Sequence, residues 1–517
     1  MKNTYYYIVT LVMLILALPM KAASEAEFGK LSKTYTLHAD GSQEMRVQKE
    51  LTLFTHAAMN RVYGESFIIY NPEYQKLDSY TRQKDGTIVK TPENAFVEVL
   101  PSAAADAPAY NSLKEMVIVH TGLELGATIY LDYSVVTRPG YLPELDVCEQ
   151  VEELSPIREY VFSLSVPESK PLHYEWLNGK IAPVVKTADG MKTVTWTLKN
   201  VQPRPYSFDV SLPAGNIQAV VASTYASKAD ALKVIKQQLE NNGKDVSELA
   251  QKLTAGAQTT EQKKDLLTVY VEGLGNCSLT LSQTGYRLRP AFEVIRSAYG
   301  TEAEKAALLA ALQQAIGIRA ELKAAFPKTE DKDAAGLAAL SGLFVTNNGV
   351  ADIQDFISVV DLNAQPVALK KVTHVISRTD TLRVSDKTGK MLAGGYRKID
   401  LPQARGGWAS YDGRMTALNT TRPVNLLLRY LPDETYTYIV KIDEGMKSTV
   451  IPTNKKMENP VGSMEVAVKK AVDKIEIIRT LKLKKQLITP ADYPAYYCLM
   501  AEWMDINGNS LLFQTIK

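Results

Sequence analysis

Thiols and imidazoles are scarce in this chain, which limits the covalent and metal chemistry available to it. Its 517 residues include three cysteines and five histidines. There is no C-x-x-C pair, and the histidines never fall at a metal-ligand spacing, so we expect no structural zinc site and no other cofactor. The histidines are His38, His56, His120, His173 and His374.

The segment "SAYGTEAEKAALLAALQQAIGIRAEL" (residues 297–322) has the pattern of a buried helix with defined ends. Thr301 and Glu304 have the spacing of a capping box, in which each side chain accepts a hydrogen bond from the other residue's amide. Leu308 and Leu312 belong to an apolar stripe, and Gly317 suits a left-handed helix end. These features alone predict a structural helix.

The same segment resembles the transglutaminase-like superfamily, in its bacterial branch related to cysteine proteases. The resemblance rests on "YG" followed by a capped helix of the form K-A-x-L-L-x-A-L-x-x-x-x-G-I-x-A (residues 305–320), and on the lead-in "GYRLRPAFEVIRSAYG". Upstream, "YTLHADGS" and "IIYNPEYQKLDSYTRQKDGTIVK" are similar to a domain of unknown function that commonly precedes such domains. Downstream, "KKMENPVGSMEV" looks like the β domain that follows them. Each motif is loose, so the order of three domains carries the resemblance.

The resemblance implies where a catalytic triad would lie. The family uses a cysteine in the first turn of this helix, a histidine opening the next strand, and an Asp or Asn on the strand after it. Where the family has Asp-Cys-Lys-Asp-Lys, this chain has Thr-Glu-Ala-Glu-Lys, so Glu302 stands at the cysteine position. By the same comparison Ser358 replaces the histidine and Lys370 the aspartate. The resemblance therefore implies a degenerate triad that cannot do cysteine-histidine chemistry.

Two catalytic alternatives remain open. Cys277, in a loop upstream of the helix, could serve as a displaced nucleophile with His374 as the nearest partner in the sequence, because no histidine lies between His173 and His374. A Ser358–Lys370 pair could in principle form a serine-lysine hydrolase, but no oxyanion site is identifiable. A non-enzymatic alternative is carbohydrate binding through the 27 tyrosines, although tyrosine is also a common strand residue.

The first 23 residues have the features of a cleaved signal peptide. Lys2 precedes an apolar run that ends before Pro19, and small residues follow at Ala22 and Ala23. Cleavage there removes two of the 59 basic residues and none of the 57 acidic ones, which leaves a neutral charge balance. We therefore expect an exported, periplasmic or secreted protein without a membrane span, and no nucleic-acid binding, which needs clustered positive charge.

Export also permits a disulfide bond. The three cysteines, Cys148, Cys277 and Cys498, allow any of three pairings, and the sequence favours none of them. The simplest expectation is that all three are small buried hydrophobic residues.

Changes in periodicity divide the rest of the chain. Asp40-Gly41 and Asp85-Gly86 separate alternating runs and predict β-hairpins. Residues 218–343 have a helical period, and strands dominate again after a glycine-rich stretch at 393–408. We predict a multidomain α+β protein. It comprises a signal peptide (1–23), an N-terminal antiparallel β domain (25–215), a transglutaminase-like, papain-like α+β domain (216–395) and a β-sandwich-like C-terminal domain (408–517).

These observations predict a non-catalytic exported protein that binds or scaffolds a cell-envelope or extracellular partner. The partner class is a protein, a peptide or a glycan. The prediction rests on the loss of all three residue types at the positions that the resemblance assigns to the triad.

Overall fold

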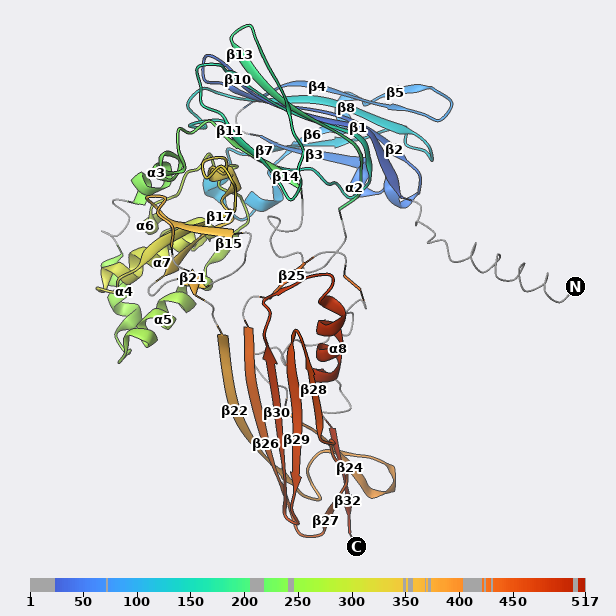
Figure 1. The fold of residues 1–517 in the computed structure, drawn as a ribbon, viewed down its shortest axis with the longest axis vertical. Helices are drawn as coiled ribbons and strands as arrows, with labels where there is room; N and C mark the ends of the chain where they lie inside the picture. Colours follow the sequence, from blue (N-terminus) through green and yellow to red (C-terminus); the bar gives the residue numbers. More distant parts are fainter. Residues whose placement is uncertain are drawn as a thin grey trace, which may run out of the picture.

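The computed structural model describes residues 24–70, 73–204, 218–239, 246–346, 350–351, 357–367, 369–370, 373–402, 421–422, 425–428, 431–504 and 510–516. The predicted signal peptide lies outside these residues. Figure 1 shows strands in the N-terminal part, most of the helices in the middle part, and a separate group of long strands in the C-terminal part. No helix among the described residues is both long enough and apolar enough to cross a membrane.

Two sheets of the N-terminal part pack against each other in a small apolar cluster. All neighbouring pairs in the larger sheet are antiparallel except β1 and β10, which are parallel. Ile68 and Met116 of the smaller sheet pack against Leu131 of the larger one. The larger sheet has the order β12-β13-β10-β1-β2-β8-β4-β5 and the smaller one β3-β7-β6. Their strands are β1 Ala26–Leu37, β2 Gln43–Leu53, β3 Glu65–Tyr70, β4 Glu73–Arg82, β5 Ile88–Lys90, β6 Phe96–Val99, β7 Lys114–Val119, β8 Thr128–Thr137, β10 Ile157–Pro167, β12 Val184–Ala188 and β13 Met191–Val201.

Both predicted hairpin turns are confirmed. β1 pairs antiparallel with β2 around Asp40-Gly41, and β4 pairs antiparallel with β5 around Asp85-Gly86. Gly41 and Gly86 have φ angles of 86° and 94°, a region that a residue with a Cβ rarely adopts.

A third sheet crosses the boundary expected at residue 215. In it, β14 (Ala219–Ser223) lies between β11 (His173–Leu177) and β9 (Asp146–Gln150), and all five residues of β14 are buried. The strand that opens the predicted middle domain is therefore hydrogen-bonded into the N-terminal part. A strand paired on both edges and buried on both faces has a continuous apolar sequence, here "AVVAS", rather than an alternating one.

The middle part places α7 (Glu302–Ala315) at its centre. Leu308 and Leu312 of α7 pack among residues of the neighbouring helices, while Ala307 and Ala310 contact Leu322 of a three-stranded sheet, β18-β17-β20. Because α7 is buried on more than one side, its apolar residues are not confined to a single stripe. The elements are α3 Lys228–Leu239, α4 Ser247–Thr254, α5 Thr260–Glu272, β15 Gly275–Cys277, α6 Ala291–Ser297, β16 Tyr299–Thr301, β17 Glu321–Pro327, β18 Gly342–Thr346, β19 Val350–Ala351, β20 Ile357–Asp361 and β21 Leu369–Lys370.

Two further sheets and a helix share one core in the C-terminal part. Buried Tyr436 and Ile477 of one sheet, Phe513 of the other, and Trp503 of the helix α8 belong to the same cluster. The sheets have the orders β22-β26-β30-β29-β28 and β23-β24-β32-β27. Their strands are β22 Thr373–Val384, β23 Lys390–Met391, β24 Tyr396–Asp400, β26 Leu431–Ile442, β27 Met446–Val450, β28 Lys455–Asn459, β29 Gly462–Lys470, β30 Lys474–Leu483 and β32 Ser510–Thr515, and α8 spans Tyr493–Trp503.

The strand pairing moves the second boundary as well. β22 pairs with β26 and β24 pairs with β32, so residues from 373 onward already belong to the C-terminal sheets. The predicted start at residue 408 lies after these strands, because a glycine-rich stretch marks a loop but does not identify the partners of the strands before it. Residues 403–420 lie outside the described part.

The expectation for the cysteines was wrong for two of the three. Cys277 is buried, whereas Cys148 and Cys498 are exposed, and all three are free thiols.

Candidate functional site

The first turn of α7 is held by the predicted capping box. The amide of Glu304 donates to Thr301 Oγ1 at 3.2 Å, and the amide of Thr301 donates to Glu304 Oε2 at 2.9 Å. Gly317 has a φ of 79°, as expected for a left-handed helix end. Glu302, the residue at the predicted cysteine position, is exposed in this turn.

Glu304 does much more than cap the helix. Its side chain is fully buried and forms a two-point ion pair with Arg289, with Nε–Oε1 and Nη2–Oε2 distances of 2.9 Å each. The phenol of Tyr110 donates to Glu304 Oε1 at 2.5 Å. Burial alone would raise the pKa of Glu304, but the hydrogen bonds from Arg289 and Tyr110 hold it below its ordinary value.

The guanidinium of Arg289 is enclosed by polar and aromatic partners. It donates to Ser297 Oγ and to the carbonyl of Tyr299, at 3.0 and 2.8 Å. Its central carbon lies 4.4 Å from the ring centroid of Tyr299 and 5.4 Å from that of Tyr110. A buried charge pair of this kind is stable only when its remaining donors and acceptors are matched, as they are here.

Tyr110 belongs to a segment of the N-terminal part that covers the beginning of α7. The segment contains two short 3-10 turns, η3 (Ser102–Ala104) and η4 (Pro108–Tyr110). The amide of Ala109 donates to the hydroxyl of Tyr299 at 2.9 Å. Ala104, Ala107, Tyr110 and Leu113 form one buried cluster with Cys277 and Leu279. We call residues 102–113 the covering segment.

Cys277 lies under this segment and beside the beginning of α7. β15 and β16 form a parallel ladder in which Cys277 is the partner of Thr301. The thiol donates to the carbonyl of Ala103 at 3.4 Å, and burial raises the pKa of Cys277. The sequence placed Cys277 in an upstream loop; the structure places it next to the helix terminus but holds it as a buried, protonated thiol.

The other two predicted triad positions lie on strands of the middle part. Ser358 is on β20, half-buried, with Phe326 of β17 as its ladder partner. Lys370 is on β21 opposite Ala351, and its side chain is outside the described part. Within the described residues, no hydrogen bond or ion pair joins Glu302 to Ser358.

Two described histidines have carboxylate partners away from Cys277. His173 Nδ1 lies 2.9 Å from Asp331 Oδ2, and His38 lies 3.5 Å from Glu44. His374 is on β22 of the C-terminal part, with Pro432 as its ladder partner, and its side chain lies outside the described part. Its predicted partnership with Cys277 stays a prediction. In the described part of the chain, no group of three His, Cys, Asp or Glu residues is arranged to hold a metal ion.

A buried polar chain inside the N-terminal sheets was not predicted. Lys49 Nζ donates to Ser66 Oγ at 2.7 Å, Ser66 lies 2.9 Å from His120 Nε2, and His120 Nδ1 lies 3.2 Å from Ser79. Burial lowers the pKa of His120 to about 3, with a smaller contribution from the charge of Lys49. Burial also lowers the pKa of Lys49 to about 8. The only sequence signal was a histidine between a strand and a glycine, in "MVIVHTG".

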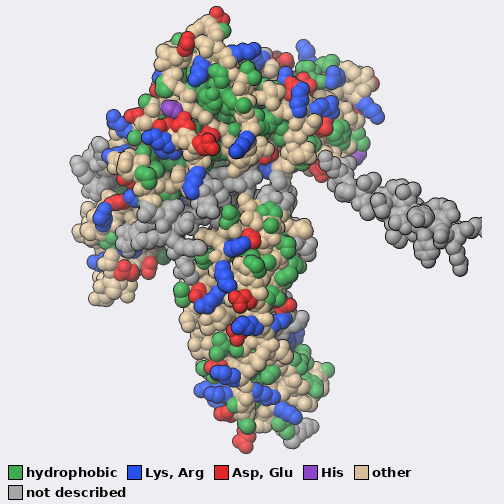
Figure 2. All heavy atoms as spheres, in the orientation of Figure 1, with side chains coloured by type: hydrophobic (Ala, Val, Ile, Leu, Met, Phe, Trp, Pro, Cys, Tyr) green, Lys and Arg blue, Asp and Glu red, His purple; other side chains and the backbone are tan. Residues whose placement is uncertain are grey.

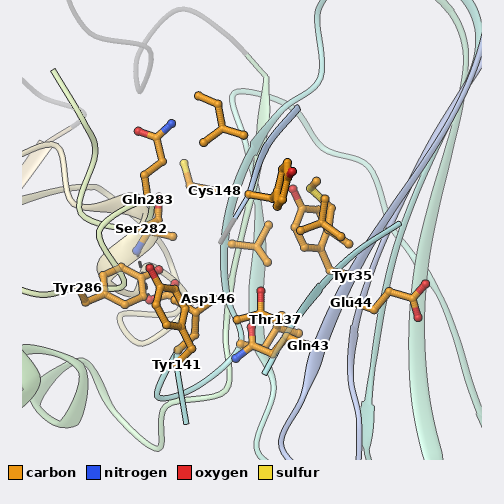
Figure 3. Close-up of a pocket in the computed structure, with 18 of the residues that line it drawn as sticks. Tyr35, Gln43, Glu44, Thr137, Tyr141, Asp146, Cys148, Ser282, Gln283 and Tyr286 are labelled. Atoms are coloured by element: carbon orange, nitrogen blue, oxygen red, sulfur yellow. Dashed lines mark hydrogen bonds between the residues drawn. The ribbon is translucent and has the colours of Figure 1, made fainter. Parts of the chain in front are cut away.

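A cavity of about 280 Å³ lies between the N-terminal and middle parts. Figure 3 shows strand residues such as Tyr35 and Thr137 on one side and Ser282, Gln283 and Tyr286 on the other. Burial raises the pKa of Asp146, which lines the cavity, to about 7. Asp146 Oδ2 accepts from the amide of Ala338 at 3.2 Å, while its buried Oδ1 has no hydrogen-bond partner among the described residues.

The described aromatic clusters offer few open ring faces for sugars. Tyr80 and Tyr130 stack on each other with centroids 4.7 Å apart, and Arg82 lies over Tyr130. A groove of about 810 Å³ is bordered by Trp176 and Trp196, but these residues are only 7% and 1% exposed. Carbohydrate binding therefore stays a prediction without a platform in these clusters. On the face shown in Figure 2, acidic and basic side chains are interspersed, in keeping with the neutral charge balance.

Known proteins resemble this chain over nearly its whole length. Residues 39–205 match a domain of unknown function, DUF3857, and residues 400–513 match another, DUF3858. A crystal structure described as a "putative protease" from Parabacteroides distasonis is 41% identical, with a TM-score of 0.83, and the match covers 95% of this chain and 99% of that one.

A second solved structure, described as a "putative cysteine protease" from Cytophaga hutchinsonii, is 14% identical over 42% of this chain and 83% of that one. Its TM-score of 0.17 is too low to support any argument. No curated protein matches the chain. On the identity and coverage of the first structure, the chain belongs to the same family as the Parabacteroides distasonis protein, and it carries a DUF3857 domain before its helical part and a DUF3858 domain after it.

Proposed function

We propose that this protein is an exported, non-catalytic member of the transglutaminase-like superfamily that binds or scaffolds a cell-envelope or extracellular partner. The observation that carries the proposal is the state of the beginning of α7. In a catalytic relative this helix terminus would stabilise a thiolate; here it presents Glu302 to solvent. The rest of the terminus is occupied by Glu304, Arg289 and Tyr110.

The covering segment supports the same proposal. An active thiol needs access to substrate and a base within hydrogen-bond reach. Cys277 has neither among the described residues: it is 2% exposed, and its hydrogen bond goes to a backbone carbonyl.

A second candidate is a cysteine peptidase or acyl transferase with a displaced nucleophile. The ladder between β15 and β16 favours this candidate, because it aligns Cys277 with Thr301, the N-cap residue of α7. The helix dipole at this N-terminus would stabilise a thiolate. This candidate requires the covering segment to move and a base to arrive from outside the described contacts. The Parabacteroides distasonis relative is described as a protease, which gives the candidate a reason to be tested.

The test is an activity assay on the full chain without residues 1–23. We expect the chain neither to hydrolyse casein or a fluorogenic peptide library nor to incorporate an amine into casein. The Glu302→Ala variant serves as the control, and the activities of the two proteins should be equal. Turnover by the unaltered chain would overturn the non-catalytic proposal. If turnover is found, Cys277→Ala decides between mechanisms, because activity that survives this substitution excludes the displaced thiol. A triple variant, Glu302→Cys with Ser358→His and Lys370→Asp, tests the assignment of the three positions by gain of activity.

A further inference from the structure

The cavity between the N-terminal and middle parts has the composition of a ligand site. It is lined mainly by apolar and tyrosine side chains with a few polar groups, and such cavities at domain junctions are the usual places for small ligands. Its volume of about 280 Å³ corresponds to roughly nine water molecules, which is enough for one side chain or a small molecule.

The charges around the cavity favour a positively charged ligand. Asp146 lines it, and no lysine or arginine is among the described residues that do so. Glu44 also borders the cavity, but its carboxylate accepts a hydrogen bond from Ser134 and points away from Asp146 (Figure 3). The guanidinium of Arg287 lies over the ring of Tyr141, 5.5 Å from its centroid, and is not part of the lining. An anion in this cavity would be desolvated beside the carboxylate of Asp146 without a counter-ion, whereas a cation would gain one.

Asp146 supplies an unused acceptor. Its Oδ2 accepts from Ala338, but its Oδ1 is buried and accepts no hydrogen bond among the described residues. A ligand N–H group is the kind of donor that this oxygen lacks. Figure 3 shows Asp146 beside Tyr141 and Tyr286, and aromatic rings next to a carboxylate form a favourable environment for an ammonium group.

The loop that closes the cavity is built in a strained conformation. Gly285 and Tyr286 both have left-handed backbones, with φ angles of 64° and 58°. A Cβ on Gly285 would lie 3.1 Å from the ring of Tyr141. A bulky residue such as tyrosine rarely adopts this conformation, and such strain is concentrated at binding and active sites.

We propose that this interdomain cavity binds an alkylammonium group, with Asp146 as its counter-ion and the rings of Tyr141 and Tyr286 against its apolar stem. The assignment gives a ligand chemistry to the binding role proposed above and rests on it in that respect. The non-catalytic role and the alkylammonium site can be refuted independently. Peptide hydrolysis by the protein would overturn the non-catalytic role without changing the occupancy of the cavity.

Cys148 provides a direct measure of occupancy. It lines the cavity and is exposed, Cys498 is exposed in the C-terminal part, and Cys277 is buried. Burial raises the pKa of Cys148 to about 12, so its thiol reacts slowly. The full chain is therefore treated with a large excess of iodoacetamide at pH 8.5, where most of Asp146 is ionised, and the labelling rate of each cysteine is followed over hours by mass spectrometry. The probes are hexylammonium, hexanoate and 1-hexanol, which share one chain length and differ in charge.

Hexylammonium at millimolar concentration is expected to slow labelling of Cys148 at least fivefold and to leave Cys498 unchanged. Equal protection by hexanoate or 1-hexanol, or no protection by hexylammonium, would overturn the proposal. Nα-acetyl-lysinamide in place of hexylammonium distinguishes a lysine side chain from a free amine as the natural source of the group.

Asp146→Asn keeps the shape of the side chain and is expected to reduce the protection to less than twofold. Asp331→Asn is the matched control, because Asp331 pairs with His173 at the same junction and does not line the cavity. Cys277 reports on folding in both variants: if it stays unlabelled while the protection of Cys148 is lost, the loss is due to the missing charge. Full protection in Asp146→Asn would reject Asp146 as the counter-ion.

Discussion

Tyr110 and Glu304 lie 194 residues apart in the sequence and are joined by a hydrogen bond of 2.5 Å. The bond links the DUF3857 domain to the first turn of the central helix of the middle part. It also fixes the covering segment over Cys277, because Tyr110 and Cys277 belong to the same buried cluster. One contact between domains thus serves both the stability of α7 and the inaccessibility of the thiol beside it.

Tyr110→Phe should lower the free energy of unfolding by about 1.5–3 kcal/mol, the usual range for a buried hydrogen bond to a charged group. Urea unfolding measures this loss. The same substitution should increase the labelling rate of Cys277 by thiol reagents, since the covering segment is then less firmly held. Tyr497→Phe is the control: Tyr497 is half-buried on α8 and has no hydrogen bond among the described residues. Unchanged stability and unchanged Cys277 labelling in Tyr110→Phe would contradict this role.

Local signals predicted local structure well. The capping box of Thr301 and Glu304 and the hairpin turn at Asp40-Gly41 are confirmed, because each depends on residues within four positions of one another.

Long-range relationships could not be predicted from the same signals. Glu304 was predicted as a cap, and nothing in its neighbourhood indicates that Tyr110 approaches it. The strand Ala219–Ser223 was included in a helical region, although its five consecutive apolar or small residues fit a fully buried strand equally well. The alignment of Cys277 with Thr301 depends on a ladder between two three-residue strands, which are too short to leave a sequence pattern.

His120 should make the protein sensitive to acid. Its pKa in the folded chain is lowered to about 3, so the folded state resists a proton that the unfolded chain accepts near pH 6.5. The stabilisation that comes from keeping His120 neutral is therefore complete above pH 6.5. As the pH falls toward 3 it is lost, and the free energy of unfolding decreases by up to about 1.4 kcal/mol per pH unit. Unfolding free energies measured from pH 7 to pH 4 should fall less steeply in His120→Gln than in the unaltered chain. His56→Gln, at an exposed histidine, should follow the unaltered chain; identical slopes for all three proteins would refute the assignment.

Lys49 should also make the stability rise with pH, but in an alkaline window. Because burial lowers its pKa to about 8, the folded state binds fewer protons than the unfolded state between pH 8 and the ordinary lysine value of about 10.4. Stability should therefore rise with pH in this window. Lys49→Met removes the buried charge and should stabilise the protein on the order of 1–3 kcal/mol at pH 7 and abolish the alkaline rise. Thermal unfolding at pH 7 and pH 10 tests both statements, with Lys90→Met, at an exposed residue of β5, as the control. A destabilised Lys49→Met at pH 7 would mean that its bond to Ser66 outweighs the cost of burial.

Gly336 should be required for the junction between the N-terminal and middle parts. A Cβ at this position would lie 2.5 Å from both carboxylate oxygens of Asp146, which reaches the 3-10 turn η6 (Leu337–Ala339) from β9. Gly336→Ala should therefore cost about 1–3 kcal/mol through overpacking. Gly342→Ala is the control, because nothing lies within 4 Å of a Cβ there and it should change the stability by less than about 0.5 kcal/mol.

The cause of that cost can be isolated with a double-mutant cycle. If the clash with the carboxylate is responsible, Asp146→Ala should make room for the new methyl group. The combined variant should then be more stable than the sum of the two single effects by at least about 0.5 kcal/mol. Strict additivity would show that Gly336 is needed for its own backbone and not for the approach of Asp146, and the junction would then have to be held by its other contacts, among them the pair of His173 with Asp331 and the bond of Tyr110 to Glu304.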